Sequence, residues 1–472
     1  MALKNKKSNF SEWYTEALLS GEFIDYSRVS GAHIYRPNSF SVWEYIHTYL
    51  DKKFKRDGVK NSYFPLLIPE KLLNKESNHV EGFSPEVAWV THAGKSKLKE
   101  RLAIRPTSET VMYDCYSKWI RSWKDLPLRL NQWANVVRWE FKHSTPFLRS
   151  REFLWQEGHS VFETKFEADK EAIKISKMYK DVYENLLAIP VLEGYKSEKE
   201  KFAGAEYSIS LETLMPDGKA IQACTSHHLG QIFAKAFNIN FLDKNEKKSL
   251  PYQNSWGITT RSIGIMLGIH GDDKGFVIPP KVAQNKIVIV PILFKGKELP
   301  VLKKSNEINK KFSKFGSILD DRSEYSPGYK FNHWEVRGIP IRIEIGPRDL
   351  ENKSVTVVRR DKGIKESVKI TKLEKRIPEL LKLIQSDMYE NASKNLKNSI
   401  VDVNSIKELK KVIDSGKIAR AYWCGSINSE NEIKKNTGAK SLNSIINANL
   451  KNKICFISGS EAKYHTYFGK SH

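Results

Sequence analysis

Apolar residues recur at helical spacing between residues 37 and 58 of the chain. They predict a helix that begins near Pro37 and Ser39 and ends at Gly58, with an apolar face of Phe40, Trp43, Ile46, Leu50 and Phe54. The apolar run at 63–68 that follows predicts a strand. Because Pro65 cannot donate a hydrogen bond to a neighbouring strand, we expect this strand at a sheet edge or an interface.

The middle of the chain continues with helical and strand-like patterns. A helix is predicted at 107–121, where Thr107 or Ser108 can cap the first turn. A polar, Lys-rich stretch over about 165–188 predicts another helix. The other expected elements are strands at 133–140 and 150–159 joined by a loop at 141–149, strand-like pieces up to about 224, a helix from Ser226 and a Gly/Thr-rich segment at 256–268.

The pattern changes at Pro279 and Pro280. Beyond them the chain predicts a second, α/β domain of roughly a hundred residues and then a small third unit that ends at His472. The alternation at 341–345 predicts a half-exposed strand. The other elements expected here are a buried strand at 286–294, a basic helix at 298–315, a strand at 354–360 paired across a turn, and a long polar helix at 371–398.

The composition adds an excess of positive charge. Among 472 residues, Lys and Arg number 78 and Asp and Glu 55, which gives a net charge of +23. The excess predicts an anionic partner, such as nucleic acid, phosphates or an acidic membrane face. Because Lys and Asn are used heavily throughout, codon usage is an alternative source of part of this charge. With 40% hydrophobic residues the chain can bury real cores, which excludes wholesale disorder.

Cysteines and apolar runs indicate the compartment. The four cysteines are too few for a disulfide scaffold in so long a chain. The first residues contain no continuous apolar segment, and the longest apolar runs, such as 287–294, are strand-sized. We therefore expect a soluble, cytoplasmic protein with no membrane partner.

Two clusters of polar residues suggest ligand binding near predicted element ends. Arg138-Trp139-Glu140 ends one predicted strand, and the following loop leads to Arg149 and Arg151. A guanidinium group can hold a phosphate bidentately, so this arrangement suits a triphosphate. The alternative is an exposed strand with Arg–Glu pairs. The second cluster, at 105–109, places Thr, Ser and Glu at a helix start, where they suit either a helix cap or a ligand.

Three more clusters lie farther along the chain. In a strand, Trp155, Glu157 and His159 point to one face, where an indole, a carboxylate and an imidazole form a poor core but a suitable pocket wall. The adjacent His227 and His228 are too close in sequence to share a face, so we expect no metal there. Glycine and hydroxyl groups at 256–261 allow a ligand to approach closely, and the Arg at its end can stack on a purine.

The order and spacing of these clusters match a known family. The chain resembles the prolyl-tRNA synthetases, which are class II aminoacyl-tRNA synthetases, over nearly its whole length. The helix to Gly58 and the strand with Pro65 match motif 1, the dimer-forming element. Residues 138–159, with the run FLRSREFLWQEGH, match motif 2, and WGITTR at 256–261 matches motif 3. The runs RPTSE and TSHHLGQ are typical of the prolyl branch.

The resemblance implies an α+β multidomain fold and a homodimer. We expect a catalytic domain at 1–280, built on the class II antiparallel sheet flanked by helices, an α/β anticodon-binding domain at 281–390 and a small α+β C-terminal domain at 391–472. The stretch between His159 and Trp256 leaves no room for a bacterial-type editing insertion. The chain therefore resembles the archaeal and eukaryote-like form.

The resemblance also implies the reaction. Proline attacks the α-phosphate of Mg²⁺-bound ATP, and the resulting prolyl-adenylate passes its acyl group to the 3′ end of tRNA(Pro). Such catalysis needs positioning and charge stabilisation rather than a protein nucleophile. By the match, Arg138 and Arg261 are catalytic. We expect ATP to contact Arg138, Glu140, Arg149, Phe153, Gln222, Thr225 and Arg261, and proline to contact Thr107, Glu109, Arg138, Trp155, Glu157, His159 and Phe202.

In the second domain the match assigns anticodon binding to Phe331, Glu335 and Arg342, with Phe331, His333 and Glu335 on one face of a strand. His333 departs from the family, since relatives usually carry an acidic residue there. A donor in place of an acceptor changes what that position can bind.

The C-terminal unit departs from the family at its metal site. Its four-cysteine zinc positions correspond here to Cys424, Ser429, Cys455 and Ser458. Because serine is a poor zinc ligand beside thiolate, we expect no bound zinc. The family's chains often end in Tyr, whereas this one ends in Ser471-His472, so no role is carried over to the tail.

Two other functions fit parts of this pattern. A catalytically inactive, synthetase-like RNA-binding protein would be expected to lose the motif 2 or motif 3 arginines, but Arg138, Arg149 and Arg261 are present. A class II enzyme for threonine would grip its substrate with zinc, whereas this pocket has Trp155 and Phe202. A proline-sized pocket rejects alanine by only about 1–3 kcal/mol, so we expect measurable alanine activation.

Overall fold

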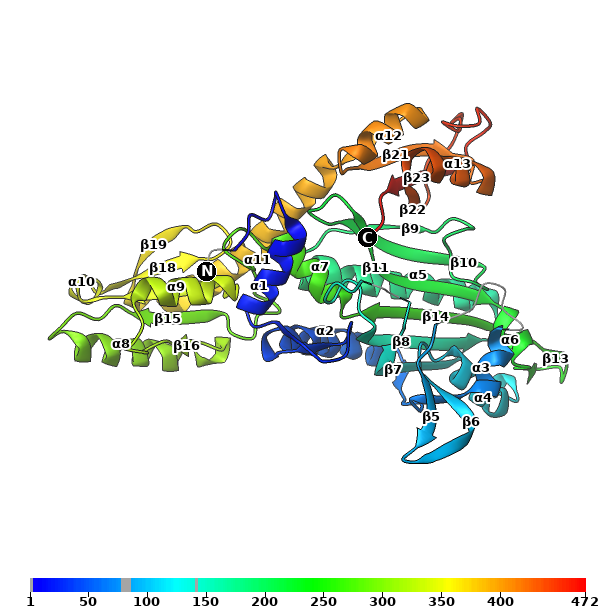
Figure 1. Ribbon diagram of the computed structural model, residues 1–472, viewed down its shortest axis with the longest axis horizontal. Coiled ribbons are helices and arrows are strands. Elements are labelled where there is room, and N and C mark those ends of the chain that lie inside the picture. The colour runs from blue at the N-terminus through cyan, green and yellow to red at the C-terminus, as the bar shows by residue number, and fades with distance from the viewer. Residues whose placement is uncertain (1–2, 78–85, 141–142) are drawn as a thin grey trace.

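The computed structural model describes residues 3–77, 86–140 and 143–472, in three sequential parts (Figure 1). The first part, up to His270, contains helices α1 (Phe10–Ser20), α2 (Pro37–Arg56), α3 (Glu70–Ser77), α4 (Glu109–Trp119), α5 (Lys165–Asp181, continued by a π-helical turn Val182–Leu186), α6 (Ile232–Ala236) and α7 (Arg261–His270). Its strands are β1 (Ile24–Tyr26), β2 (His33–Tyr35), β3 (Lys60–Asn61), β4 (Leu67–Pro69), β5 (Trp89–Ala93), β6 (Ser96–Ile104), β7 (Leu128–Val137), β8 (Glu152–Phe162), β9 (Leu192–Tyr195), β10 (Tyr207–Leu214), β11 (Ala220–Gly230), β12 (Phe241–Leu242), β13 (Lys248–Ser249) and β14 (Tyr252–Thr259).

The second part is built around a five-stranded sheet of order β16-β15-β17-β18-β19. Its elements are β15 (Ile287–Pro291), α8 (Glu298–Lys311), β16 (Ile318–Leu319), α9 (Pro327–Val336), β17 (Ile341–Ile345), α10 (Pro347–Glu351), β18 (Ser354–Arg359), β19 (Lys365–Lys369) and α11 (Leu373–Asn398). In Figure 1 this sheet lies at one end of the molecule, and α11 leads from it to the third part.

The third part contains β20 (Ile400–Asp402), α12 (Ile406–Asp414), β21 (Ile418–Trp423), α13 (Ile427–Thr437), β22 (Lys440–Ile445) and β23 (Tyr464–Gly469). Its strands extend the sheet of the first part, because β22 pairs with β9. Together they form an eleven-stranded sheet of order β20-β21-β23-β22-β9-β10-β11-β14-β8-β7-β3. The pairing is antiparallel except for β20 with β21 and β3 with β7. The predicted α+β multidomain fold is confirmed.

One face of the central strands is covered by α5. Side chains that point to this face bond to the helix: Ser226 donates to the carbonyl of Ala172, and Asn254 to that of Ala168. Apolar residues from α1, α2, α5, α7 and the sheet complete the largest core. The opposite face of the same strands is left for the site described below. Within the described ranges no helix is long and apolar enough to cross a membrane.

One strand prediction and one helix prediction in the first part are wrong. Of the predicted strand 63–68 only the last two residues fall in β4; the backbone N–H of Phe64 bonds to the side chain of Gln132, and the carbonyls of Phe64 and Leu66 accept from Arg105. Side-chain partners have replaced a strand ladder there, beside Pro65. The helix from Ser226 is wrong as well, because β11 continues to Gly230, whose φ of 59° ends it.

Two predictions in the second part are also wrong. The segment with Phe331, His333 and Glu335 is helix α9, which begins at Pro327 and is capped by Ser326, whose hydroxyl accepts from the N–H of Tyr329. Strand β17 is buried on both faces rather than half-exposed, since it lies at the centre of its sheet. The polar residues that alternate along it therefore need buried partners.

The other predicted elements correspond to observed ones with shifted ends. Helix 37–58 is α2, 107–121 is α4, 165–188 is α5 with its π-helical turn, and 371–398 is α11. The predicted domain limits 280/281 and 390/391 fall before β15 and inside α11, respectively.

Candidate active site

A cavity of about 320 Å³ opens on the face of the central sheet that α5 does not cover. It is bounded by β8, β11 and β14, by the segment before α4 and by residues 147–150. Of the predicted ligand-binding residues, the following line it: Thr107, Glu109, Arg138, Arg149, Phe153, Trp155, Glu157, His159, Phe202, Gln222, Thr225 and Arg261. Glu140 does not; it lies exposed beyond the end of β7, next to residues 141–142, which are outside the described ranges.

Strand register brings the floor of the cavity together. Trp155, Glu157 and His159 alternate on β8, as predicted, and face the cavity. On β14 Gly257 lies directly opposite both Glu157 of β8 and Thr225 of β11. Because Gly257 has no side chain, it leaves open space between these two polar residues. A Cβ atom there would lie 3.2 Å from the carbonyl oxygen of Gln156 and occupy that space.

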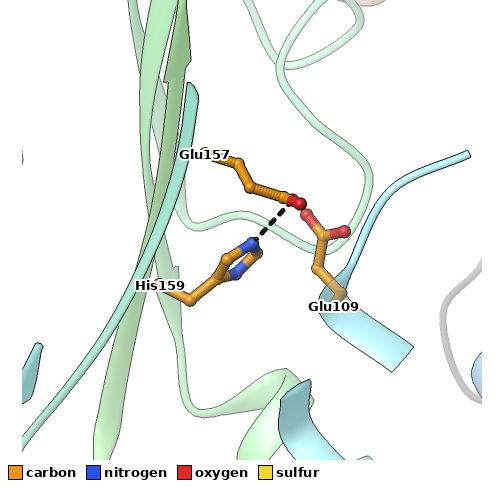
Figure 2. A group of neighbouring side chains, drawn as sticks. All are labelled: Glu109, Glu157 and His159. Carbon is orange, nitrogen blue, oxygen red and sulfur yellow. Dashed lines mark hydrogen bonds and ion pairs between the residues drawn. The ribbon is translucent and has the colours of Figure 1, made fainter. Parts of the chain in front are cut away.

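At one end of the cavity, two carboxylates and an imidazole converge (Figure 2). Glu109, Glu157 and His159 each place a ligand atom within 4.8 Å of the others, and all three are buried. His159 contacts the Glu157 carboxylate through Nε2 at 3.1 Å and the Tyr113 hydroxyl through Nδ1 at 3.0 Å. Two acidic groups against one base leave the cluster with an excess of negative charge, which suits a cationic ligand.

The electrostatics of His159 follow from these neighbours. Burial alone would lower the pKa of His159, but the hydrogen bond to Glu157 and the charge of Glu109 raise it above its usual value. The imidazole therefore partly neutralises Glu157.

At the other end of the cavity, arginine side chains converge. Arg138 donates through Nε to the carbonyl of Pro106 at 3.0 Å, and its guanidinium lies 5.5 Å from the Trp155 ring centroid. Arg261 donates to the carbonyls of Leu148 and Gln222 at 3.1 and 3.2 Å. Neither Arg138 nor Arg261 forms an ion pair with an acidic side chain in the described part of the chain.

Burial lowers the pKa of Arg261, and the charges of Arg138 and Arg149 lower it further. Such mutual repulsion in a buried site is relieved by an anion. The carbonyl contacts point both guanidinium groups into the cavity, where phosphate oxygens can complete their hydrogen bonds. Arg149 also donates to the carbonyl of His472 at 3.4 Å, which places the end of the chain beside the arginines.

Sequence reasoning missed several residues that line this cavity: Lys196, Glu200, Ser208, His227 and Ser255. The two-residue period from Thr225 along β11 would have found His227. Its Nδ1 lies 2.7 Å from the Ser208 hydroxyl, and burial lowers the pKa of His227 to about 3, so it stays neutral. The neighbouring His228 points to the other face of β11, as the sequence analysis expected.

In the second part, the three predicted anticodon-binding residues form one cluster. Phe331 and Glu335 are four residues apart on helix α9 and so share a face, although not that of a strand. Arg342 of β17 donates to Glu335 at 3.0 Å, and its guanidinium lies 4.1 Å from the ring centroid of Phe331. It also pairs with Glu344 at 2.9 Å. His333 points elsewhere, toward Tyr329 and Trp334.

Around Cys424 the third part gathers serine hydroxyls. The Cys424 sulfur lies 3.5 Å from the hydroxyl oxygens of Ser426 and Ser429. Burial opposes ionisation, but hydrogen bonds from Ser426, Ser429 and Ser458 lower the pKa of the Cys424 thiol to about 6. Ser429 also accepts a hydrogen bond from the Trp423 indole at 2.7 Å. Protein donors thus already occupy the oxygen that a metal would need.

Comparison with known families matches all three parts of the chain. A model of the tRNA synthetase class II core domain (G, H, P, S and T) matches residues 89–270, an anticodon binding domain model matches 286–380, and a model of the prolyl-tRNA synthetase C-terminal domain matches 406–472.

Individual relatives are similar over nearly the whole chain. A proline–tRNA ligase of Alkaliphilus oremlandii is 47% identical over 98% of this chain and 96% of its own length. The cytoplasmic proline–tRNA ligase of Arabidopsis thaliana is 46% identical over 99% of this chain and 90% of its own. A bifunctional glutamate/proline–tRNA ligase of Mus musculus is 45% identical over 99% of this chain, which spans about a third (33%) of that relative.

Proposed function

The chain belongs to the prolyl-tRNA synthetase family of class II tRNA synthetases, and we propose that its cavity carries out the proline–tRNA ligase reaction. In that reaction a proline carboxylate oxygen attacks the α-phosphorus of ATP and pyrophosphate leaves. The tRNA 3′-terminal hydroxyl then attacks the acyl carbon, and AMP leaves. One observation carries the proposal: a single cavity joins a buried acidic cluster to Arg138 and Arg261, which form no ion pair with an acidic side chain among the described residues.

The acidic end fits the proline ammonium. A secondary ammonium offers two N–H donors, and the Glu109 carboxylate and the Thr107 hydroxyl are two acceptors from one segment. Trp155 and Phe202 enclose the pyrrolidine ring, with Glu157 and His159 completing the wall. The ring is apolar, so the aromatic side chains favour it by burial.

The basic end fits ATP. Arg138 belongs to the basic end but lies 5.5 Å from the ring of Trp155, so it can hold both the proline carboxylate and the α-phosphate and stabilise the charge that develops between them. Arg149 reaches the γ-phosphate, and Arg261 and Phe153 take the adenine faces. Glu140, at the end of β7, is proposed to recognise the adenine side of the nucleotide.

Magnesium is expected with the nucleotide, held mainly by phosphate and water. Gln222 and Thr225, which line the cavity, offer neutral oxygens suited to such a hydrated ion. The ion would supply neutralisation of the phosphate charge. The side chains named above would position the reacting groups.

Transfer RNA is the macromolecular partner in this proposal. The cluster of Phe331, Glu335 and Arg342 offers an aromatic face together with donor and acceptor groups, which suits unpaired anticodon bases. For the chain's compartment we propose the cytoplasm, the one named for the plant relative.

A homodimer is also proposed. The hairpin of β1 and β2, just before α2, exposes large apolar side chains: Tyr26 is 51% exposed, Val29 53% and Ile34 51%. Phe40, in the first turn of α2, is 39% exposed. Such a local group of exposed apolar residues is typical of a protein interface, and motif 1 is where the family's dimer contact is expected. Size-exclusion chromatography with light scattering measures the oligomeric state directly.

The donor set around Cys424 does not suit zinc. Two of the four positions are hydroxyls, and Ser429 is already engaged by Trp423 and Ser426. We propose that this part holds together by its own core, which includes Trp423, Cys455 and Phe468. Metal analysis of the purified protein is expected to find far less than one zinc per chain, and a stoichiometric zinc would contradict the proposal.

ATP–pyrophosphate exchange against the twenty amino acids tests the function. Proline-dependent exchange that Arg138→Ala abolishes is the expected result. Weaker exchange with alanine is expected too, because a proline-sized pocket rejects the smaller side chain only by lost packing. No exchange with any amino acid would favour the inactive RNA-binding alternative, and threonine-dependent exchange would favour the other enzyme class.

A further inference from the structure

The two carboxylates of the acidic cluster have different partners. The Glu157 carboxylate receives hydrogen bonds on Oε1 from Gln132 Nε2 at 2.9 Å and from the Ser108 hydroxyl, while its Oε2 faces His159 at 3.1 Å. For Glu109 the one side-chain donor found in the described residues is the Thr107 hydroxyl. Glu157 is thus bonded to three protein side chains, whereas Glu109 retains capacity for a ligand.

Gln132 is held in the orientation that this arrangement needs. It lies on β7 directly opposite Glu157 of β8 and is fully buried. Its Oε1 accepts from the backbone N–H of Phe64, so its NH₂ group must point the other way. That group donates to Glu157 and also to the Ser108 hydroxyl at 3.1 Å. A backbone donor therefore sets the direction of the side-chain amide.

We propose that Gln132 is a positioning residue of the proline site, which holds the Glu157 carboxylate against His159 so that Glu109 and Thr107 remain the acceptors for the substrate ammonium. This inference rests on the proposed function. Gln132 itself does not line the cavity and acts through Glu157. Ser108 supports the same carboxylate from the N-cap of α4, where its side chain makes no capping hydrogen bond.

The charged and titratable groups around this network come from several elements. Glu109 and Tyr113 face it from α4, His159 from β8 and His227 from β11. Arg105 lies behind Phe64, to whose carbonyl it donates at 2.8 Å. Any carboxylate introduced beside Glu157 would therefore meet two acidic groups at close range.

Gln132→Glu uses this proximity as a test. The new side chain keeps the shape and the Phe64 acceptor, but when ionised it repels Glu157 instead of donating to it. Loss of a hydrogen bond to a charged group costs about 1.5–3 kcal/mol, so the KM for proline should rise about tenfold or more near pH 8. The KM for ATP should change less than about twofold. As the pH falls toward about 6, the buried carboxyl takes up a proton, can donate again, and the proline KM should recover.

Gln156→Glu is the matched control. Gln156 is equally buried, on the neighbouring strand, but bonds to Asn131 and Tyr179 on the α5 face of the sheet. Its proline KM should follow the same pH dependence as that of the wild type. Gln132→Met keeps the side-chain volume but has no hydrogen-bond donor, so it should raise the proline KM with no recovery at low pH. If Gln132→Glu does not fold, the proline KM of Gln132→Met tests the proposal.

Three results would overturn the inference: an unchanged proline KM in Gln132→Glu and Gln132→Met, an equal rise in the ATP KM, or the same pH-dependent effect in Gln156→Glu. A wild-type protein without proline-dependent exchange would instead overturn the proposed function, and this inference with it. The wild-type measurement thus separates the two failures.

Discussion

Two arginines that line the cavity and the arginine beside Phe331 in the second part are held in opposite ways. Arg138 and Arg261 contact backbone carbonyls and, among the described residues, form no ion pair with an acidic side chain. Arg342, by contrast, is paired with both Glu335 and Glu344. The first arrangement leaves positive charge for an anionic ligand, while the second neutralises it and leaves oriented donors and an aromatic face for uncharged bases.

This difference predicts which changes affect chemistry and which affect stability. Removing an unpaired arginine costs ligand binding but relieves repulsion in the protein. Removing a paired one takes the nearest cation from its carboxylates, which destabilises a fold by up to about 3–5 kcal/mol when the pair is fully buried. Four predictions test this comparison.

Arg138→Ala should have the largest effect. Because it removes the charge between the two reacting groups, the rate of proline-dependent ATP–pyrophosphate exchange should fall about a thousandfold. The apparent Tm should stay within a few degrees of wild type. Arg342→Ala is the comparison variant, and its exchange rate should equal that of wild type. Comparable losses of exchange in both variants would contradict the distinction.

Gly257→Ala should reduce exchange about tenfold to thirtyfold. The added methyl group would enter the space between Glu157 and Thr225, with its carbon 3.2 Å from the Gln156 carbonyl oxygen. Overfilling a close-packed site commonly costs about 1–3 kcal/mol. Steady-state exchange kinetics with proline and ATP varied separately would measure it. Unchanged KM and kcat would show that ligands do not use this space.

Arg342→Ala should raise the KM for tRNA in aminoacylation about tenfold, because it removes a base-contacting donor and unstacks Phe331. Thermal unfolding should show a loss of a few degrees, since Glu335 and Glu344 lose the guanidinium they share. Among the described residues, each then keeps only a more distant lysine, Lys274 at 3.8 Å and Lys365 at 3.4 Å, respectively. Arg342→Lys keeps the positive charge but not the planar, multi-donor guanidinium. It should therefore restore thermal stability more fully than the KM for tRNA. A stable variant with normal tRNA kinetics would exclude Arg342 from the anticodon site.

The smallest expected effect concerns an ion pair between the first and second parts of the chain. Arg360, which follows β18, donates a hydrogen bond from each Nη to the carboxylate of Asp272, at 2.6 Å each. Asp272 follows α7. Burial would raise the pKa of Asp272, but the hydrogen bonds and charge of Arg360 hold it below the usual value. A lowered pKa means that the pair stabilises the fold above the unfolded-state pKa of about 3.9 and that this contribution is lost as the pH falls through the folded value.

Asp272→Asn should therefore lower the apparent Tm slightly at pH 7 and by less at about pH 3, because the contribution fades as the pH falls from the unfolded-state pKa toward the lowered folded value. Since the Asp272 side chain is 44% exposed, solvent screening limits the loss to about 1 kcal/mol or less. Differential scanning calorimetry at both pH values measures it. A difference that persists in acid would show that the pair acts through something other than its charge.

Much of the site could be predicted from the sequence, since short motifs place side chains at regular intervals. The alternation of Trp155, Glu157 and His159 on a strand required only a period of two. The cluster of Phe331, Glu335 and Arg342 came from the family resemblance, but its secondary structure was predicted wrongly. Over five residues, alternate polar and aromatic positions fit a strand and a helix about equally well, and the Ser326-Pro327 helix start was overlooked.

What the sequence determined by itself is the set of chemical groups, their order and the local periods on which they lie; these sufficed for the family, the three parts and about half of the cavity lining. Tertiary structure alone decided the partners. Pairing of β7 with β8 placed Gln132 opposite Glu157, and the central place of β17 buried Arg342 with its carboxylates. Such partners come from strands and helices far apart in the chain, and no local pattern encodes register between them.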